Sequence, residues 1–249
     1  MNLLAVERIK LFSTRSPWGC AVLAIVLTVG FSALFMAPGE DIEVFQTQNA
    51  YQFGLAVVMV LAALTITTEY RFGTIRSTFQ AVPQRTPALL AKTAVVSLTA
   101  GIIGLVCGFG AWGLSTLLKP TANLALDSAQ EWRNVAGLGP VFALTAIISI
   151  AVGIMIRHTA GTITLLLIEM MLVESLFVAL GDTGKDIHKW LPFSGMANRF
   201  LFAGSRPDGA EAAQASVSTL DPWWALAYLA AIAAVLLTTA IVTAKRRDA

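Results

Sequence analysis

The sequence predicts an all-α integral membrane protein with six membrane-spanning helices in a single domain of residues 1–249. Hydrophobic residues make up 56% of the chain and charged residues only 13%, whereas an average soluble domain has about 25% charged residues. The mean hydropathy is +0.72. The apolar residues gather in long runs, and no long polar block divides the chain into separate units. These observations together exclude an ordinary soluble domain.

Six apolar runs are long enough to cross a hydrocarbon core about 30 Å thick at about 1.5 Å per residue. The third run is longer than a bilayer requires, so we expect it to tilt or project. Before the first run, Glu7, Arg8 and Lys10 alternate with apolar residues, which predicts an N-terminal interfacial helix over residues 1–16 that Pro17 ends. The predicted spans are residues 18–36, 50–68, 93–118, 135–156, 159–180 and 222–244.

Glycines recur in the third predicted span. Gly104 and Gly108 form one G-x-x-x-G spacing, which allows two helix backbones to approach closely. This spacing fits close packing within the chain, and it also fits a contact with a second copy.

A polar segment at residues 69–82 lies between the second and third predicted spans and is the predicted working part of the chain. At about 100° per residue its apolar side chains form one stripe with an arginine at each margin, which predicts an amphipathic helix at the membrane surface. An ordinary short loop between two spans is the alternative. The stripe comprises Phe72, Ile75, Phe79 and Val82, and its margins are Arg71 and Arg76.

The distribution of Lys and Arg predicts the orientation of the chain. If both termini are cytoplasmic, the inner side holds 11 of the 17 Lys and Arg residues and the outer side holds 6, which agrees with the positive-inside rule. The acidic segment 38–43 then lies outside. We therefore expect a multi-pass protein of the cell membrane with both termini and residues 69–82 in the cytoplasm. The formal net charge of +2 is too small to indicate a nucleic-acid partner.

Two carboxyl groups, those of Glu169 and Glu174, lie within the fifth predicted span. A carboxylate near the bilayer midplane costs about 2.5 to 3.5 kcal/mol, so Glu169 is expected to face protein or a wet cavity. Five residues turn a regular helix by about 140°, which predicts different faces for the two side chains. Each is either part of a substrate path or a structural hydrogen-bonding group, and the path role is favoured less for Glu174.

Several short segments, taken in order, resemble bacterial ABC-2 type transporter permeases, particularly actinobacterial ones. The similar segments are residues 7–11 (ERIKL), residues 69–76 (EYRFGTIR) and residues 191–193 (LPF), the last in the long loop before the final span. With the six spans, the resemblance covers nearly the whole chain. No phosphate-binding loop is present, because residues 181–186 lack the first glycine and the hydroxyl residue of that motif.

The resemblance implies a non-enzymatic transport subunit that exports a hydrophobic or amphipathic substrate. It implies as partners ATP-binding cassette ATPase subunits, which bind the ATP and Mg, and a second permease copy or a paralogue. It also implies that residues 69–82 form a coupling helix docked on the ATPase, and that residues 191–202 form a re-entrant outer segment. The implied ATPase-coupling residues are Glu69, Arg71, Phe72, Gly73, Ile75, Arg76 and Phe79.

Two other functions fit parts of the sequence. One is a membrane sensor or scaffold that binds an ATPase without moving cargo. The other is an intramembrane metalloprotease, which would need acidic and histidine ligands at one site. His158 and His188 lie on opposite sides of the predicted membrane, about 30 Å apart, so no metal site is predicted.

Overall fold

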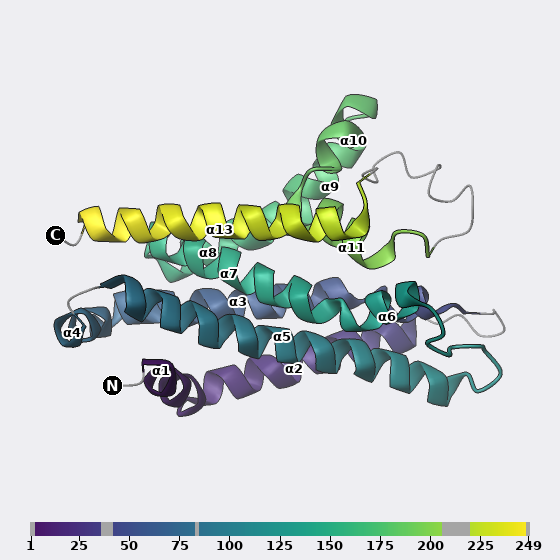
Figure 1. The fold of residues 1–249 in the computed structure, drawn as a ribbon, viewed down its shortest axis with the longest axis horizontal. Helices are drawn as coiled ribbons and strands as arrows, with labels where there is room; N and C mark the ends of the chain where they lie inside the picture. Colours follow the sequence, from purple (N-terminus) through teal and green to yellow (C-terminus); the bar gives the residue numbers. More distant parts are fainter. Residues whose placement is uncertain (1–2, 36–41, 83–84, 206–219, 248–249) are drawn as a thin grey trace.

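A computed structural model of the chain describes residues 3–35, 42–82, 85–205 and 220–247. All regular structure within these ranges is helical, and six helical stretches are long and apolar enough to cross a membrane. They lie side by side in one bundle (Figure 1), which confirms the predicted all-α fold with six helices of membrane-spanning length and composition. The stretches are α2 (Arg15–Leu34), η1 with α3 (Val44–Gln48, Tyr51–Arg71), α5 (Arg85–Leu118), α7 (Leu138–Ile156), α8 with η2 and α9 (Thr159–Ile168, Glu169–Val173, Glu174–Ala179), and α13 (Pro222–Arg247).

The helices α3 and α7 form the centre of the bundle. In each of them 61% of the most apolar window is buried, against 22% for α2 and 28% for α13. Met59 on α3 and Phe142 on α7 have no exposed surface. The outer helices instead expose large apolar side chains such as Leu98 and Val235. Their composition fits a surface in contact with lipid.

The glycines of α5 allow it to pack closely against its neighbours in the same chain. A Cβ atom added to Gly104 would lie 2.5 Å from the carbonyl oxygen of Leu138, and one added to Gly108 would overlap the carbonyl oxygen of Val135. These contacts bring α5 against α6 (Ala129–Ala136) and the start of α7. The intrachain interpretation of the G-x-x-x-G spacing is therefore confirmed.

The two ends of the bundle carry different short helices (Figure 1). The helices α1 (Leu3–Phe12) and α4 (Thr74–Ala81) lie at the same end as the last turn of α13. At the opposite end lie α6 and α11 (Ala197–Phe202), which follows η3 (Pro192–Met196). The helix α10 (Asp182–His188) projects away from the bundle axis. The first helix, the last turn of α13 and the segment after the second span thus share one end, as predicted.

Three predicted boundaries differ from the observed ones. Pro17 does not end the first helix, because α1 stops at Phe12 and Pro17 lies in the first turn of α2, where a backbone N–H has no helical partner to lose. The third span begins at Arg85 rather than at residue 93, with Pro87 in its first turn for the same reason. The fourth predicted span is divided at Gly137 into α6 and α7. Most of the predicted acidic segment 38–43 lies outside the described residues.

Candidate functional site

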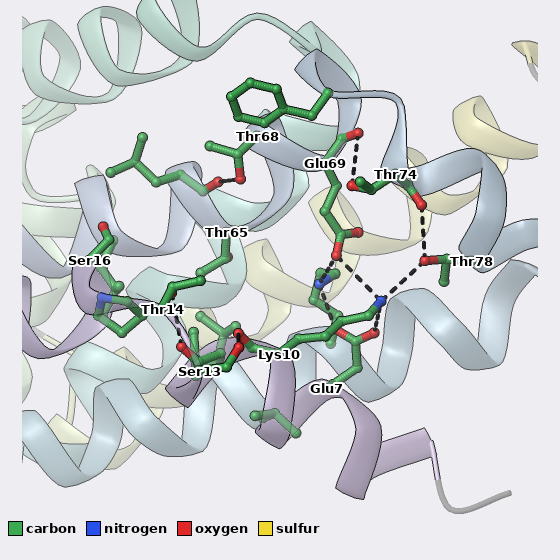
Figure 2. A pocket seen from close by; sticks show the side chains of 18 of the residues that line it. Glu7, Lys10, Ser13, Thr14, Ser16, Thr65, Thr68, Glu69, Thr74 and Thr78 are labelled. Atoms are coloured by element: carbon green, nitrogen blue, oxygen red, sulfur yellow. Dashed lines mark hydrogen bonds and ion pairs between the residues drawn. The ribbon is translucent and has the colours of Figure 1, made fainter.

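Four charged side chains from three distant parts of the chain meet at the end of the bundle that carries α1 and α4 (Figure 1), and Figure 2 labels three of them, Glu7, Lys10 and Glu69. Glu7 and Lys10 come from α1, where their spacing of three residues puts them on one face of the helix. Glu69 comes from the last turns of α3, and Lys92 from the first turns of α5. We call these four residues the ion cluster.

Lys92 is at the centre of the ion cluster. Its Nζ lies 2.5 Å from Oε2 of Glu7 and 2.9 Å from Oε1 of Glu69. The Nζ of Lys10 lies 3.0 Å from Oε1 of Glu7 and 3.5 Å from Oε1 of Glu69. The exposed fractions of the Glu7, Lys92 and Glu69 side chains are 6%, 7% and 13%. Two carboxylates and two ammonium groups therefore neutralise each other largely out of water.

The ion pairs favour the charged forms of Glu7 and Lys10 on α1. Burial alone would raise the pKa of Glu7, but the ammonium of Lys92 and the hydrogen bonds from Lys92 and Lys10 lower that pKa below its ordinary 4.5. Burial alone would lower the pKa of Lys10, but its hydrogen bond to Glu7 and the charge of Glu69 raise it above 10.5. Both side chains are therefore charged at neutral pH.

The ion cluster is also connected to α4. The Nζ of Lys10 donates a hydrogen bond of 3.1 Å to Oγ1 of Thr78, near the middle of α4 (Figure 2). Lys10 thereby joins α1 to α4 while it also contacts the carboxylate of Glu69 at the end of α3. These contacts connect α4 to α1 and α3, and Glu7 and Lys92 extend the connection to α5.

A cavity of about 640 Å³ adjoins the ion cluster, between α1, the start of α2, α3, α4 and the start of α5. Its volume lies in the usual range for small-molecule sites, about 300 to 1,000 Å³. Most of the exposed wall is apolar, and hydroxyl and charged groups form the rest. The apolar lining includes Leu11, Leu61, Leu64, Val95 and Val96, and the polar lining includes Ser13, Thr14, Thr65, Thr68, Ser77 and Thr78.

The predicted single helix over residues 69–82 is wrong. The helix α3 continues to Arg71, and α4 starts at Thr74. Between them Gly73 has φ +72°, a left-handed conformation that side-chain-bearing residues rarely adopt. This glycine lets the chain leave α3 and begin a separate short helix. Glu69 consequently belongs to α3 and to the ion cluster, not to a docking surface.

The predicted apolar stripe is also divided. Phe72 is 71% exposed, and the Arg71 guanidinium lies 5.6 Å from the centre of its ring. Ile75 is buried, and Phe79 is half-buried against the core. The Arg76 side chain lies outside the part of the structure that is described. Arg71, Phe72 and Gly73 thus form the accessible part of the predicted coupling segment.

Glu169 and Glu174 lie on one side of their helix, contrary to the prediction of different faces. The segment between them is a π-helix, in which the N–H of Glu174 donates to the carbonyl of Glu169. This wider turn brings residues five apart together, and the two carboxyl groups interact directly. The predicted separation of about 140° between Glu169 and Glu174 applies only to a regular α-helix, and this segment is a π-helix.

The two glutamates have different surroundings. Glu174 is fully buried, and its carboxylate accepts hydrogen bonds from the backbone N–H groups of Phe193, at 2.9 Å, and of Ser194. It therefore holds the start of η3, which is the structural role weighed for it. Glu169 has a buried Oε2 without a hydrogen-bond partner in the described residues, so the substrate-path hypothesis remains for Glu169.

The two histidines do not meet. The Nδ1 of His158 accepts a hydrogen bond of 3.0 Å from the N–H of Gly161 and caps α8. His188 lies beyond the far end of α9 and contacts Ser194. In the residues that the structure describes, no group of three His, Cys, Asp or Glu side chains is arranged for a metal ion.

Sequence reasoning placed Glu7, Lys10 and Lys92 among surface charges and did not connect them. The sequence does indicate that Lys92 is buried, because Lys92 shares one helical face with Leu89 and Val96, which are both buried. A lysine on an apolar stripe needs a carboxylate partner.

Neither a search against models of known protein families nor a comparison with curated proteins finds a match for this chain. The function is accordingly argued from the geometry of the ion cluster, the cavity and α4. The resemblance drawn from the sequence remains an expectation.

Proposed function

We propose that this chain is the permease subunit of an ATP-driven transporter of the ABC-2 type, in the cell membrane with both termini in the cytoplasm. The observation that carries the proposal is α4, a short helix at the end of the bundle between two long apolar helices. Its contact with Lys10 ties it to the ion cluster. The similarity of residues 7–11 and 69–76 to that family supports the same function.

The attachment of α4 suits the transmission of force. An ATPase outside the membrane can move membrane helices only through an element that is rigid and accessible. Lys10 contacts Thr78 on α4, Glu7 on α1 and Glu69 on α3. Movement of α4 therefore reaches several helices together, and nucleotide binding on the partner would bias the bundle between two arrangements.

The accessible residues beside α4 have the composition of an interaction surface. Phe72 and Arg71 are exposed and adjacent, and aromatic and arginine side chains are enriched among the residues that dominate protein interfaces. We assign Arg71, Phe72 and Gly73 to contact with the ATPase, and Ile75 and Phe79 to holding α4 against the bundle. The ATPase supplies the ATP and Mg sites, and a second permease copy or paralogue completes the assembly.

The opposite end of the bundle is proposed to be external. Eleven of the 17 Lys and Arg residues then lie on the inner side. The segment η3 with α11, held by Glu174, would form the re-entrant outer segment. Glu169 would face the substrate path, and the cargo would be a hydrophobic or amphipathic molecule that is exported.

Co-purification from native membranes tests the proposal. The tagged chain should retain an ATPase that hydrolyses ATP, and the variants Phe72→Ala and Arg71→Glu should lose it. Truncation of an anchoring aromatic residue costs about 1 to 3 kcal/mol of binding, and a rim arginine acts mainly on association in a salt-dependent way. Phe35→Ala is the matched control, because Phe35 is 58% exposed and follows the far end of α2. Retention of the ATPase by both variants at the parent level would contradict the assignment.

A further inference from the structure

Along α3 and α5, the lining of the cavity beside the ion cluster changes from charged to apolar. Along α3, Glu69 lies at the end of the bundle, and Leu61 lies about 12 Å further in at 1.5 Å per residue. The hydroxyl groups of Thr65 and Thr68 lie between these levels. On α5 the same order appears from Lys92 to the apolar pair that follows it. This order matches an amphiphile whose head stays at the end of the bundle and whose chain points inward.

The charge that a ligand in this cavity can reach is positive. The exposed fraction of the Lys10 side chain is 39%, against 6% for Glu7 and 13% for Glu69. Both carboxylates are mostly buried beside their ammonium partners, with Oε2 of Glu69 left without a hydrogen-bond partner in the described residues, while Lys10 remains accessible. The hydroxyl groups of Ser13 and Ser77 also line the cavity, but they donate to the carbonyl oxygens of Lys10 and Thr74. The accessible ammonium of Lys10 therefore favours a head that carries an anionic acceptor.

One of the Lys10 contacts can readily be exchanged for a ligand. Lys10 donates to the carboxylate of Glu7 and to the neutral hydroxyl of Thr78. The Thr78 hydroxyl carries no net charge, whereas an anionic oxygen adds a Coulombic attraction to the Lys10 ammonium, so an anionic oxygen would replace the Thr78 hydroxyl. Such a replacement would release α4 from α1.

We propose that this cavity binds an amphiphile with an anionic head group, whose head contacts Lys10 and whose chain contacts Leu61, Leu64 and Val96. The inference rests on the proposed function in one respect, because it makes this amphiphile the class of cargo. Binding itself requires neither ATP nor a partner, so it can be tested separately.

The test measures saturable binding of radiolabelled dodecyl phosphate to the purified chain in nanodiscs, with empty nanodiscs as background. Decyl phosphate should compete. Inorganic phosphate and dodecyltrimethylammonium should not, because the first lacks the chain and the second has the opposite charge. Lys10→Gln should weaken binding about tenfold or more, as expected for loss of a hydrogen bond to a charged group.

A second variant tests binding of the amphiphile without changing the ion cluster. Leu64→Trp should fill the apolar part of the cavity and abolish saturable binding while all four charges remain. Val235→Trp, on an exposed face of α13, is the matched control and should bind like the parent. Absence of saturable binding, equal competition by the cationic amphiphile, or unchanged binding in Leu64→Trp would overturn the inference. Dodecyl phosphate binding by a chain that retains no ATPase would support the site and contradict only the transporter assignment.

Discussion

Lys92 is the residue on which the ion cluster most depends, because its ammonium contacts the carboxylates of both Glu7 and Glu69. We predict that Lys92→Met destabilises the protein by about 3 to 5 kcal/mol, since removal of one partner from a buried ion pair leaves an uncompensated charge. The measurement is the melting temperature in nanodiscs. Lys245→Met, at an exposed position of α13, is the control. A Lys92→Met protein that melts with the parent would show that the cluster is not stabilising.

The pKa of Glu7 makes the docking of α1 dependent on pH. Because the ion pairs lower this pKa below 4.5 in the folded protein, the ionised carboxylate stabilises α1 fully above that value. The contribution is lost as the pH falls from about 4.5 through the folded-state pKa. A spin label at Arg8→Cys, an exposed position on α1, should therefore become more mobile at acid pH. Glu7→Gln should remove this dependence, and an identical pH response in both proteins would refute it.

At the scale of elements, the close packing of α5 against α6 and α7 predicts a sharp difference between two identical substitutions. Gly104→Ala places a Cβ 2.5 Å from the carbonyl oxygen of Leu138, so it should destabilise the fold by about 1 to 3 kcal/mol through overpacking. Gly113→Ala meets nothing within 4 Å and should be neutral or stabilise by up to about 1 kcal/mol, because alanine favours helix. Equal melting temperatures for the two variants would be inconsistent with this packing.

The long helices were predictable from the sequence, whereas their interruptions were not. A long uncharged run predicts a membrane-spanning helix regardless of which helices pack beside it. The helices α2, α3 and α13 therefore lie close to the predicted ranges. The break at Gly73 depends on one residue adopting φ +72°. The sequence prediction assumed a regular helix at 100° per residue, and this assumption hides such a break. It also hides the π-helix from Glu169 to Val173.

The ion cluster could not be predicted because its contacts join distant parts of the sequence. Glu7 and Lys92 are 85 residues apart, and local charge patterns give no sign of such a pairing. The apolar stripe of 69–82 predicted contact of Ile75 and Phe79 with the bilayer boundary or the ATPase, whereas both side chains pack against the core of this chain. It also grouped Phe72 with them, because the stripe assumed a continuous helix.

For the whole molecule, the shared location of α1, α4 and the end of α13 predicts the pattern of labelling in intact cells. In a background without Cys20 and Cys107, an impermeant maleimide should label Ala125→Cys from outside. It should label Ser77→Cys only after permeabilisation. Both positions are exposed; Ser77 belongs to α4 and Ala125 to the segment between α5 and α6, and α4 and α6 lie at opposite ends of the bundle (Figure 1). The reverse pattern would invert the proposed orientation, and labelling of both in intact cells would contradict the six-span arrangement.

The separation of Glu7 from Lys92 also bears on how the chain is made. At about 5 to 20 residues per second, the ribosome needs roughly 4 to 17 s to add the 85 residues between them. Throughout that interval Glu7 exists without the ammonium of Lys92, its partner in the folded protein. The ion pair that holds α1 against α5 therefore forms only after the beginning of the third span has been made.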